Sequence, residues 1–169
     1  MSLLAWIEQT GLSVWIREAP TLWAFPFILF LHTLGLAFLV GINVAFNLWI
    51  VGFSDRYPMA PLERLFPVMW AGFWVNAASG FLLLIAYPAK ALTDEVFYLK
   101  MGLITACLVQ LNWLRQQVFV ERDASIARIL SARVRQVAIV ILIFWAGAIL
   151  AGRFLAYTYN IMMAGEAML

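Results

Sequence analysis

The chain has 169 residues, of which 65% are hydrophobic and 12% charged, and its formal net charge is +2. Soluble domains carry about twice this charged fraction, and a chain of this length cannot bury so much apolar surface in a water-soluble core. The composition, with a mean hydropathy of +0.92, therefore indicates a membrane protein. The basic residues form no run, so nucleic acid is not an expected partner.

Residues 1–20 predict a short amphipathic helix that is too polar to span a bilayer. Trp6 and Trp15 favour a position in the membrane interface, where indole rings lie at headgroup depth. Gly11 is expected to break this helix. Ser13 is expected to cap a second turn.

Apolar stretches after this segment predict four transmembrane helices. The first stretch, residues 21–53, contains no Asp, Glu, Lys or Arg and exceeds the ~20 residues that cross a bilayer core. The remaining spans are expected at about residues 65–87, 96–114 and 137–159, with a short tail at 161–169. The predicted fold is all-α: a polytopic four-helix bundle over residues 21–160, preceded by the interfacial helix.

The loops predict an orientation in the membrane. Residues 54–64 and 115–135 lie on one side of a four-span protein, and the second of these loops is expected to form helical extensions on the membrane surface. Seven arginines fall on this side and four basic residues towards the termini. The positive-inside rule then places both termini on the periplasmic side of a bacterial inner membrane.

Polar side chains inside the spans are the candidates for function, because lipid penalises a polar group without a partner. His32, the one histidine of the chain, lies ~15 Å from the outer end of its helix at the rise of an α-helix. Lys100 and Arg153 lie ~7 Å from the same side by the same count. A bundle that gathers these residues would hold an imidazole at mid-membrane below two cations, in a pocket open to the outer leaflet.

Such a pocket favours an amphiphilic ligand with an apolar body and an anionic end. Haem b is one candidate: His32 would bind the iron, and the two cations would meet the propionates. A quinone is the alternative, with its carbonyls accepting hydrogen bonds from the same pocket. The candidate cofactor-binding residues are His32, Asn76, Lys100, Arg153 and Asn43, with His32 as the candidate metal ligand.

A structural interpretation stays open beside this one. Buried histidines and asparagines often only hydrogen-bond across helices, and Lys100 and Arg153 are close enough to helix ends to reach lipid phosphates. The second ligand of a haem would be Met69, Met101 or a residue of another copy of the chain. Otherwise the iron would have no second protein ligand. The structural alternative is therefore an accessory membrane subunit without a cofactor of its own.

Motifs of catalysis are not found in the sequence: it has no Walker loop, dinucleotide fingerprint, nucleophile elbow or paired acids. The protein is not expected to be an enzyme, and is at most a non-catalytic subunit of a membrane redox complex. The expected partners are the lipid bilayer and other membrane subunits or a second copy of the chain.

Three patterns carry a resemblance to known families. They are LHTLGLAFLVG in the first span, N-x-x-S-G at Asn76, Ser79 and Gly80, and AGRFLAY ending the fourth. Together they resemble uncharacterised bacterial four-helix integral membrane proteins. The L-H-x-x-G within the first pattern is more weakly similar to copper-resistance D-type and small b-type cytochrome membrane proteins. That similarity implies haem or metal binding, and here it covers His32.

Overall fold

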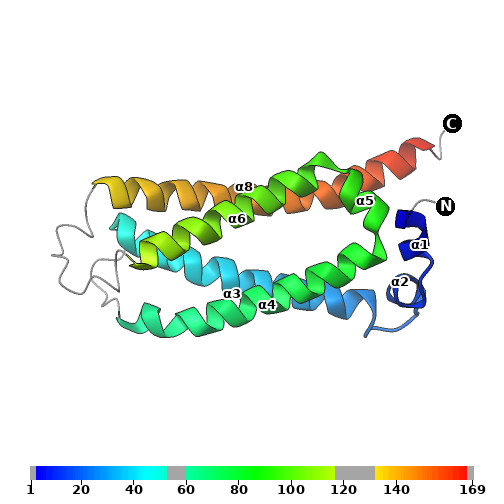
Figure 1. The fold of residues 1–169 in the computed structure, drawn as a ribbon, viewed down its shortest axis with the longest axis horizontal. Helices are drawn as coiled ribbons and strands as arrows, with labels where there is room; N and C mark the ends of the chain where they lie inside the picture. Colours follow the sequence, from blue (N-terminus) through cyan, green and yellow to red (C-terminus); the bar gives the residue numbers. More distant parts are fainter. Residues whose placement is uncertain (1–2, 53–59, 117–131, 167–169) are drawn as a thin grey trace. The chain divides into compact units, whose positions relative to one another are not determined.

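The computed structural model describes residues 3–52, 60–116 and 132–166. No strand occurs in these ranges, so the predicted all-α class is confirmed. Figure 1 shows the helices, which are α1 (Leu3–Glu8), α2 (Gly11–Glu18), α3 (Phe25–Val51), α4 (Ala60–Ala86), α5 (Pro88–Thr93), α6 (Glu95–Arg115) and α8 (Ala132–Glu166). Most of the predicted surface helix, residues 117–131, lies outside the described residues.

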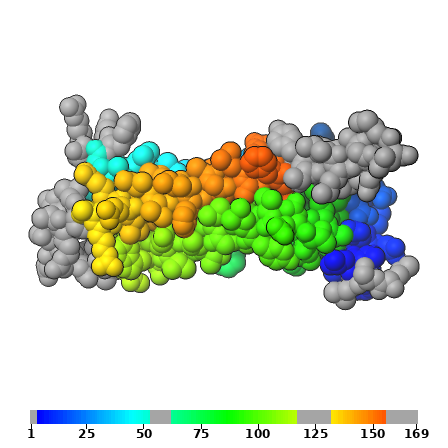
Figure 2. Space-filling view, turned by 90° about the horizontal axis from the view of Figure 1, so that it is seen from above, coloured from blue at the N-terminus to red at the C-terminus, as the bar shows by residue number. Residues whose placement is uncertain are grey.

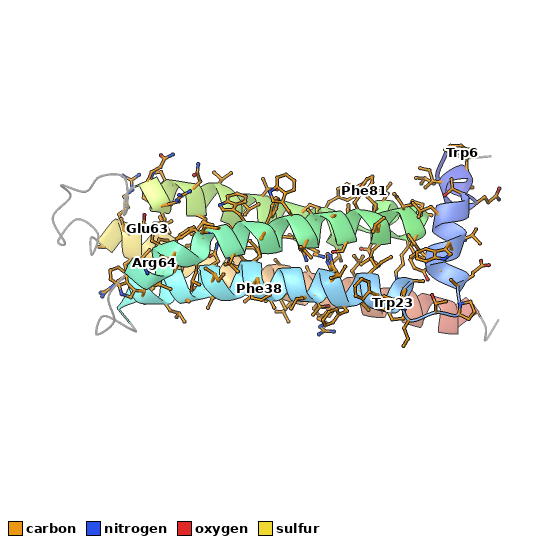
Figure 3. The ribbon with its side chains drawn as sticks, turned by 90° about the horizontal axis from the view of Figure 1, so that it is seen from below. Trp6, Trp23, Phe38, Glu63, Arg64 and Phe81 are labelled. Atoms are coloured by element: carbon orange, nitrogen blue, oxygen red, sulfur yellow. The ribbon has the colours of Figure 1, made fainter. Side chains whose placement is uncertain are left out.

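Four of the described helices are long and apolar enough to cross a membrane: Phe25–Val51, Leu62–Ala86, Glu95–Arg115 and Ala132–Leu155. A helix satisfies its backbone polar groups internally, which lipid requires of any spanning segment. Large apolar side chains are exposed along these helices, and Figure 3 shows Phe81 on the side of α4 that faces away from α3. The protein is therefore a multi-pass membrane protein whose apolar helices suit contact with lipid.

The chain forms two compact units. The first comprises Met1–Gly41 and Leu65–Glu95, and the second comprises Ile42–Arg64 and Val96–Leu169. Helices α3 and α4 each contribute to both units. His32 and Asn76 belong to the first unit, whereas the other three candidate site residues belong to the second.

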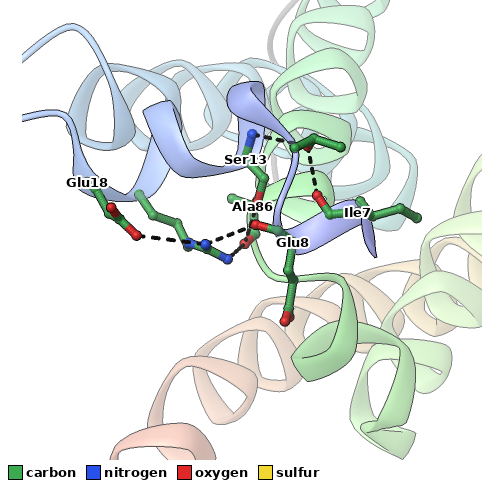
Figure 4. A network of polar contacts seen from close by, with 7 residues as sticks. Ile7, Glu8, Ser13, Glu18 and Ala86 are labelled. Carbon is green, nitrogen blue, oxygen red and sulfur yellow. Dashed lines mark hydrogen bonds and ion pairs between the residues drawn. The ribbon is translucent and has the colours of Figure 1, made fainter. Parts of the chain in front are cut away.

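The N-terminal segment of the first unit contains two short helices. Thr10 caps α2, because its hydroxyl accepts a hydrogen bond from the Ser13 amide at 3.5 Å. The expectation that Ser13 is the cap is wrong. The Ser13 hydroxyl donates instead to the carbonyl of Ala86 at the end of α4, at 3.3 Å (Figure 4).

A small apolar core fixes α2 against the ends of α3 and α4. Its buried members are Ile16, Ile28 and Ala86, with Phe25, Leu82, Leu83 and Tyr87 packed around them. Each buried aliphatic side chain removed from water contributes about 1.5–3 kcal/mol. Because α2 supplies Ile16 to this core, the segment is held by apolar packing as well as by its bonds to the Ala86 carbonyl.

Two glycines let α3 and α4 cross with their backbones in contact. A Cβ built on Gly35 would lie 2.6 Å from the Asn76 nitrogen and 2.7 Å from the Gly72 oxygen. A Cβ built on Gly72 would lie 2.8 Å from the Phe38 Cβ. Small residues are the usual means by which membrane helices approach closely. This crossing places the side chains one turn further along α4 beside α3.

In the second unit, α6 and α8 lie side by side (Figures 1 and 2). The buried thiol of Cys107 is 3.9 Å from the carbonyl oxygen of Ile141. A Cβ built on Gly147 would lie 3.3 Å from a methyl carbon of Leu103. Cys107 thus has the structural position expected of a small core residue.

Gly52 follows the last residue of α3 and has a positive φ of 95°. Residues with a Cβ rarely adopt this backbone conformation. We expect Gly52→Ala to lower the free energy of unfolding by about 1 kcal/mol. The new methyl group would also lie 2.9 Å from Arg135 Nη2, but a flexible guanidinium can move aside. Denaturant unfolding in detergent micelles measures this loss.

The matched control is Gly102→Ala within α6, where nothing lies within 4 Å of the added Cβ. That change is expected to leave stability unchanged or to raise it by up to about 1 kcal/mol, since alanine favours a helix over glycine. Equal effects of the two substitutions would contradict the backbone explanation for Gly52.

Candidate functional site

The side chain of His32 in α3 points at the Asn76 carbonyl and the Ser79 hydroxyl of α4. Its ring nitrogen Nδ1 lies 3.0 Å from the backbone carbonyl oxygen of Asn76 and 3.3 Å from the hydroxyl oxygen of Ser79. The ring is half-buried. The imidazole is therefore held on one edge by α4 within the first unit.

Asn76 binds back to the same residue of α3. Its side-chain Nδ2 donates to the carbonyl oxygen of His32 at 2.7 Å and lies 3.3 Å from His32 Nδ1. The nearby Ser79 hydroxyl lies 2.6 Å from the carbonyl of Val75 and 3.1 Å from that of Asn76, so its proton has acceptors on its own helix. Each of the two helices thus bonds to a backbone carbonyl of the other.

This network assigns the position of the ring proton. The Asn76 carbonyl can only accept, so at 3.0 Å His32 Nδ1 carries the hydrogen. The Asn76 amide already has a closer acceptor in the His32 carbonyl, and the Ser79 oxygen can accept from the ring. In the neutral imidazole the lone pair then lies on Nε2. This is the tautomer that metal-binding histidines adopt when the other ring nitrogen bonds a carbonyl.

Gly80 makes room for the imidazole against α4. A Cβ built at this position would lie 3.0 Å from His32 Cε1 and 3.3 Å from His32 Nδ1. Real Cβ atoms are rarely so close to another side chain, so an added methyl would displace the ring. Asn76, Ser79 and Gly80 therefore act together: two of them bind the imidazole, and the third gives it space.

Asn43 occupies a different environment, in the second unit. It is fully buried, and its carbonyl and Oδ1 accept from Asn47 Nδ2 at 2.8 and 2.7 Å. Its own Nδ2 has no hydrogen-bond partner among the described residues. Three further buried atoms have no hydrogen-bond partner among the described residues: Asn47 Oδ1, Gln110 Oε1 and Trp145 Nε1. Buried polar atoms of this kind need a water or a ligand.

The two predicted cations also belong to the second unit. Lys100 is half-buried, and its side-chain Cε lies 3.6 Å from a Cβ built on Gly152 of α8. Arg153, the next residue of α8, is exposed. The aliphatic part of Lys100 thus lies against the helix that carries Arg153. The pocket that would join these cations to His32 stays a prediction.

Several of these polar groups were less easily found from sequence. Ser79 and Gly80 stand in the N-x-x-S-G pattern, which marks their spacing but not their contact with His32. Trp145 is more difficult, because an indole within an apolar span normally indicates the core or the interface. The sequence signal is its depth, because Trp145 lies near the middle of the predicted span at residues 137–159. The structure shows that this residue is buried.

Within the described residues, His32 is not part of a cluster of three or more metal-ligating side chains. No group of three or more His, Cys, Asp or Glu side chains in the described parts of the chain is placed to hold a metal. Met69 is buried seven residues before Asn76, about 10 Å along the helix axis, so it does not lie level with the imidazole.

The fold and these polar contacts define a class, a small all-α membrane protein with four candidate spans. No family model, curated protein or solved structure matches the chain.

Proposed function

We propose that the protein is a small inner-membrane subunit that binds an amphiphilic redox cofactor, haem b or a quinone, at His32. The proposal includes Asn76 as the residue that orients the ring, Lys100 and Arg153 as anion partners, and Asn43 as a further donor. Both termini would lie in the periplasm, with the pocket open to the outer leaflet.

One observation carries the proposal: the Nδ1 atom of His32, in the first candidate span, lies 3.0 Å from the carbonyl oxygen of Asn76. That bond directs the lone pair of the neutral ring to Nε2. The bond also restricts rotation of the imidazole, so less conformational freedom is lost when a ligand binds. The similarity of L-H-x-x-G to small b-type cytochrome proteins agrees with this use of the residue.

For haem b, His32 Nε2 would bind the iron, and Lys100 and Arg153 would meet the propionates. Bound haem would supply one-electron transfer at its iron. For a quinone, the neutral ring would accept a hydrogen bond from the hydroxyl of the reduced form. The protonated ring would donate from Nε2 to a carbonyl of the oxidised form. In both cases Asn76 keeps the proton on Nδ1.

The second candidate is an accessory subunit whose polar residues only join helices. The observation that favours it is the Gly35–Gly72 crossing, beside which the His32–Asn76 bonds already link α3 to α4. This candidate expects the chain to copurify with larger subunits that carry the chemistry. It also expects a loss of stability, and of nothing else, when His32 is replaced.

Purified full-length protein from cells that make haem and quinones tests the proposal. We expect either a Soret absorption band or a quinone in the organic extract, close to one per chain. His32→Ala should remove it. Thr105→Ala should retain it, because this exposed hydroxyl donates to the carbonyl of Met101 on its own helix.

Thermal unfolding of each preparation separates loss of ligand from loss of fold. A folded His32→Ala protein without the ligand supports the proposal. A folded wild-type protein that is colourless and free of quinone overturns it, as does a His32→Ala protein that keeps the ligand in full. Either of these results, with larger subunits in the same preparation, would favour the accessory candidate.

A further inference from the structure

Arg17 is fixed at the end of α4 by two backbone carbonyls. Its Nη1 donates to the Ala86 carbonyl at 3.2 Å, and its Nη2 donates to the Glu8 carbonyl at 3.0 Å (Figure 4). The side chain is 22% exposed. The guanidinium therefore keeps one position, partly shielded from solvent, in the first unit.

The carbonyls do not neutralise the charge of this guanidinium. Within the described residues its ion pair is with Glu18, at 3.9 Å, and the Glu18 side chain is 67% exposed. Glu8 contributes its backbone, and its side chain extends away from the network in Figure 4. A guanidinium has five N–H groups, and these two bonds use two of them. The remaining N–H groups can bind an anion in the forked geometry that suits phosphate.

Arg17 also lines an open hollow of about 430 Å³. The rest of the lining mixes apolar and polar groups: the side chains of Leu22, Phe25, Pro26 and Tyr87, with the linker at residues 19–21. The ring of Tyr87 packs edge-on against Phe25, with centroids 6.1 Å apart. The hollow thus combines one fixed cation with an apolar wall, as an amphiphile requires.

The surroundings of the hollow suit the membrane interface. Leu22 is 80% exposed and Trp23 70% exposed, immediately before the first span. Lys90 adds a second cation, with Nζ 6.0 Å from the centroid of the Tyr87 ring. Burial lowers the pKa of the Lys90 ammonium, and the Asp94 carboxylate partly opposes that effect. An anion beside Tyr87 would therefore meet Arg17 and Lys90, with the Glu18 and Asp94 carboxylates as the nearby negative charges.

We propose that this hollow binds an anionic phospholipid. Arg17 hydrogen-bonds the phosphodiester, Lys90 contributes long-range attraction, and one acyl chain runs along Leu22 and Phe25. This site is separate from the His32 site, and the inference does not depend on any cofactor. It gives the N-terminal segment a function: it presents a lipid-binding arginine at headgroup depth.

Native mass spectrometry of the full-length protein in detergent tests this inference with three probes. Phosphatidylglycerol is anionic, phosphatidylcholine has a phosphate but no net charge, and diacylglycerol has no phosphate. We expect binding to weaken in that order. Arg17→Gln should weaken phosphatidylglycerol binding about fivefold, the value of one basic residue near an anionic lipid. Arg17→Lys should lose less, because the charge remains.

Ser13→Ala is the matched structural control. Ser13 donates to the same Ala86 carbonyl as Arg17 but carries no charge. We expect this variant to bind phosphatidylglycerol within about twofold of wild type. Equal losses in Ser13→Ala and Arg17→Gln would show that only the docking of α2 matters and would overturn the proposal. Unchanged binding in Arg17→Gln, or diacylglycerol binding as tight as phosphatidylglycerol, would overturn it too.

Discussion

Replacing Gly35 or Gly72 with alanine is expected to lower the free energy of unfolding by about 3 kcal/mol, at the upper end of overpacking effects. The cause is the backbone contact between α3 and α4. The added Cβ at position 35 would lie 2.6 and 2.7 Å from backbone atoms of α4, which have no rotamer to change. The helices must separate, and every contact along this crossing weakens with them.

Gly41→Ala is the control for this prediction. Gly41 lies in the same helix as Gly35 and is exposed, and nothing lies within 4 Å of its added Cβ. The free energy of unfolding of Gly41→Ala is expected to equal that of the wild type or to exceed it by up to about 1 kcal/mol. Denaturant unfolding in detergent micelles measures both variants. A Gly35→Ala protein as stable as Gly41→Ala would show that the two backbones are not in contact in the membrane protein.

Asn76→Leu is expected to cost about 1.5 kcal/mol, near the maximum measured for hydrogen bonds between membrane helices. The change keeps a similar volume but removes the 2.7 Å bond from Nδ2 to the His32 carbonyl. The imidazole also loses a neighbour that holds its orientation. If His32 binds a cofactor, the bound fraction should therefore fall in the folded variant.

The same substitution at Asn112 provides the comparison. Asn112 is exposed on α6, so Asn112→Leu is expected to change stability by no more than about 0.5 kcal/mol. Unfolding in detergent measures the stability of both variants, and the absorption spectrum or the quinone extract measures the ligand. An Asn76→Leu protein with the stability of Asn112→Leu would contradict a structural link between His32 and Asn76.

The helical class followed from sequence because α3 carries no charge from Phe25 to Val51, and a run of 27 residues suits a spanning helix, whereas a spanning strand needs only about 9–11. His32 and Asn76 were also identified from sequence, because lipid penalises a polar side chain that has no partner. Their pairing was not predictable, because it depends on the crossing at Gly35 and Gly72. Periodicity describes one helix at a time and does not say which helix a face will meet.

Local patterns were misleading where a distant group determined the outcome. Ser13 has the chemistry of a helix cap, yet it bonds the carbonyl of Ala86, 73 residues later. Thr10, one turn earlier, then caps α2. The depth count applied to Lys100 and Arg153 gives height along a helix but not direction around it, and Arg153 is exposed.

The Ala86 carbonyl has a consequence for how the chain is made. It belongs to the last turn of α4, where a helix leaves acceptors unsatisfied. Its donors come from Ser13 and Arg17, 73 and 69 residues earlier. During synthesis those two side chains emerge long before their acceptor exists. The N-terminal segment therefore stays undocked until the end of the second candidate span has been made.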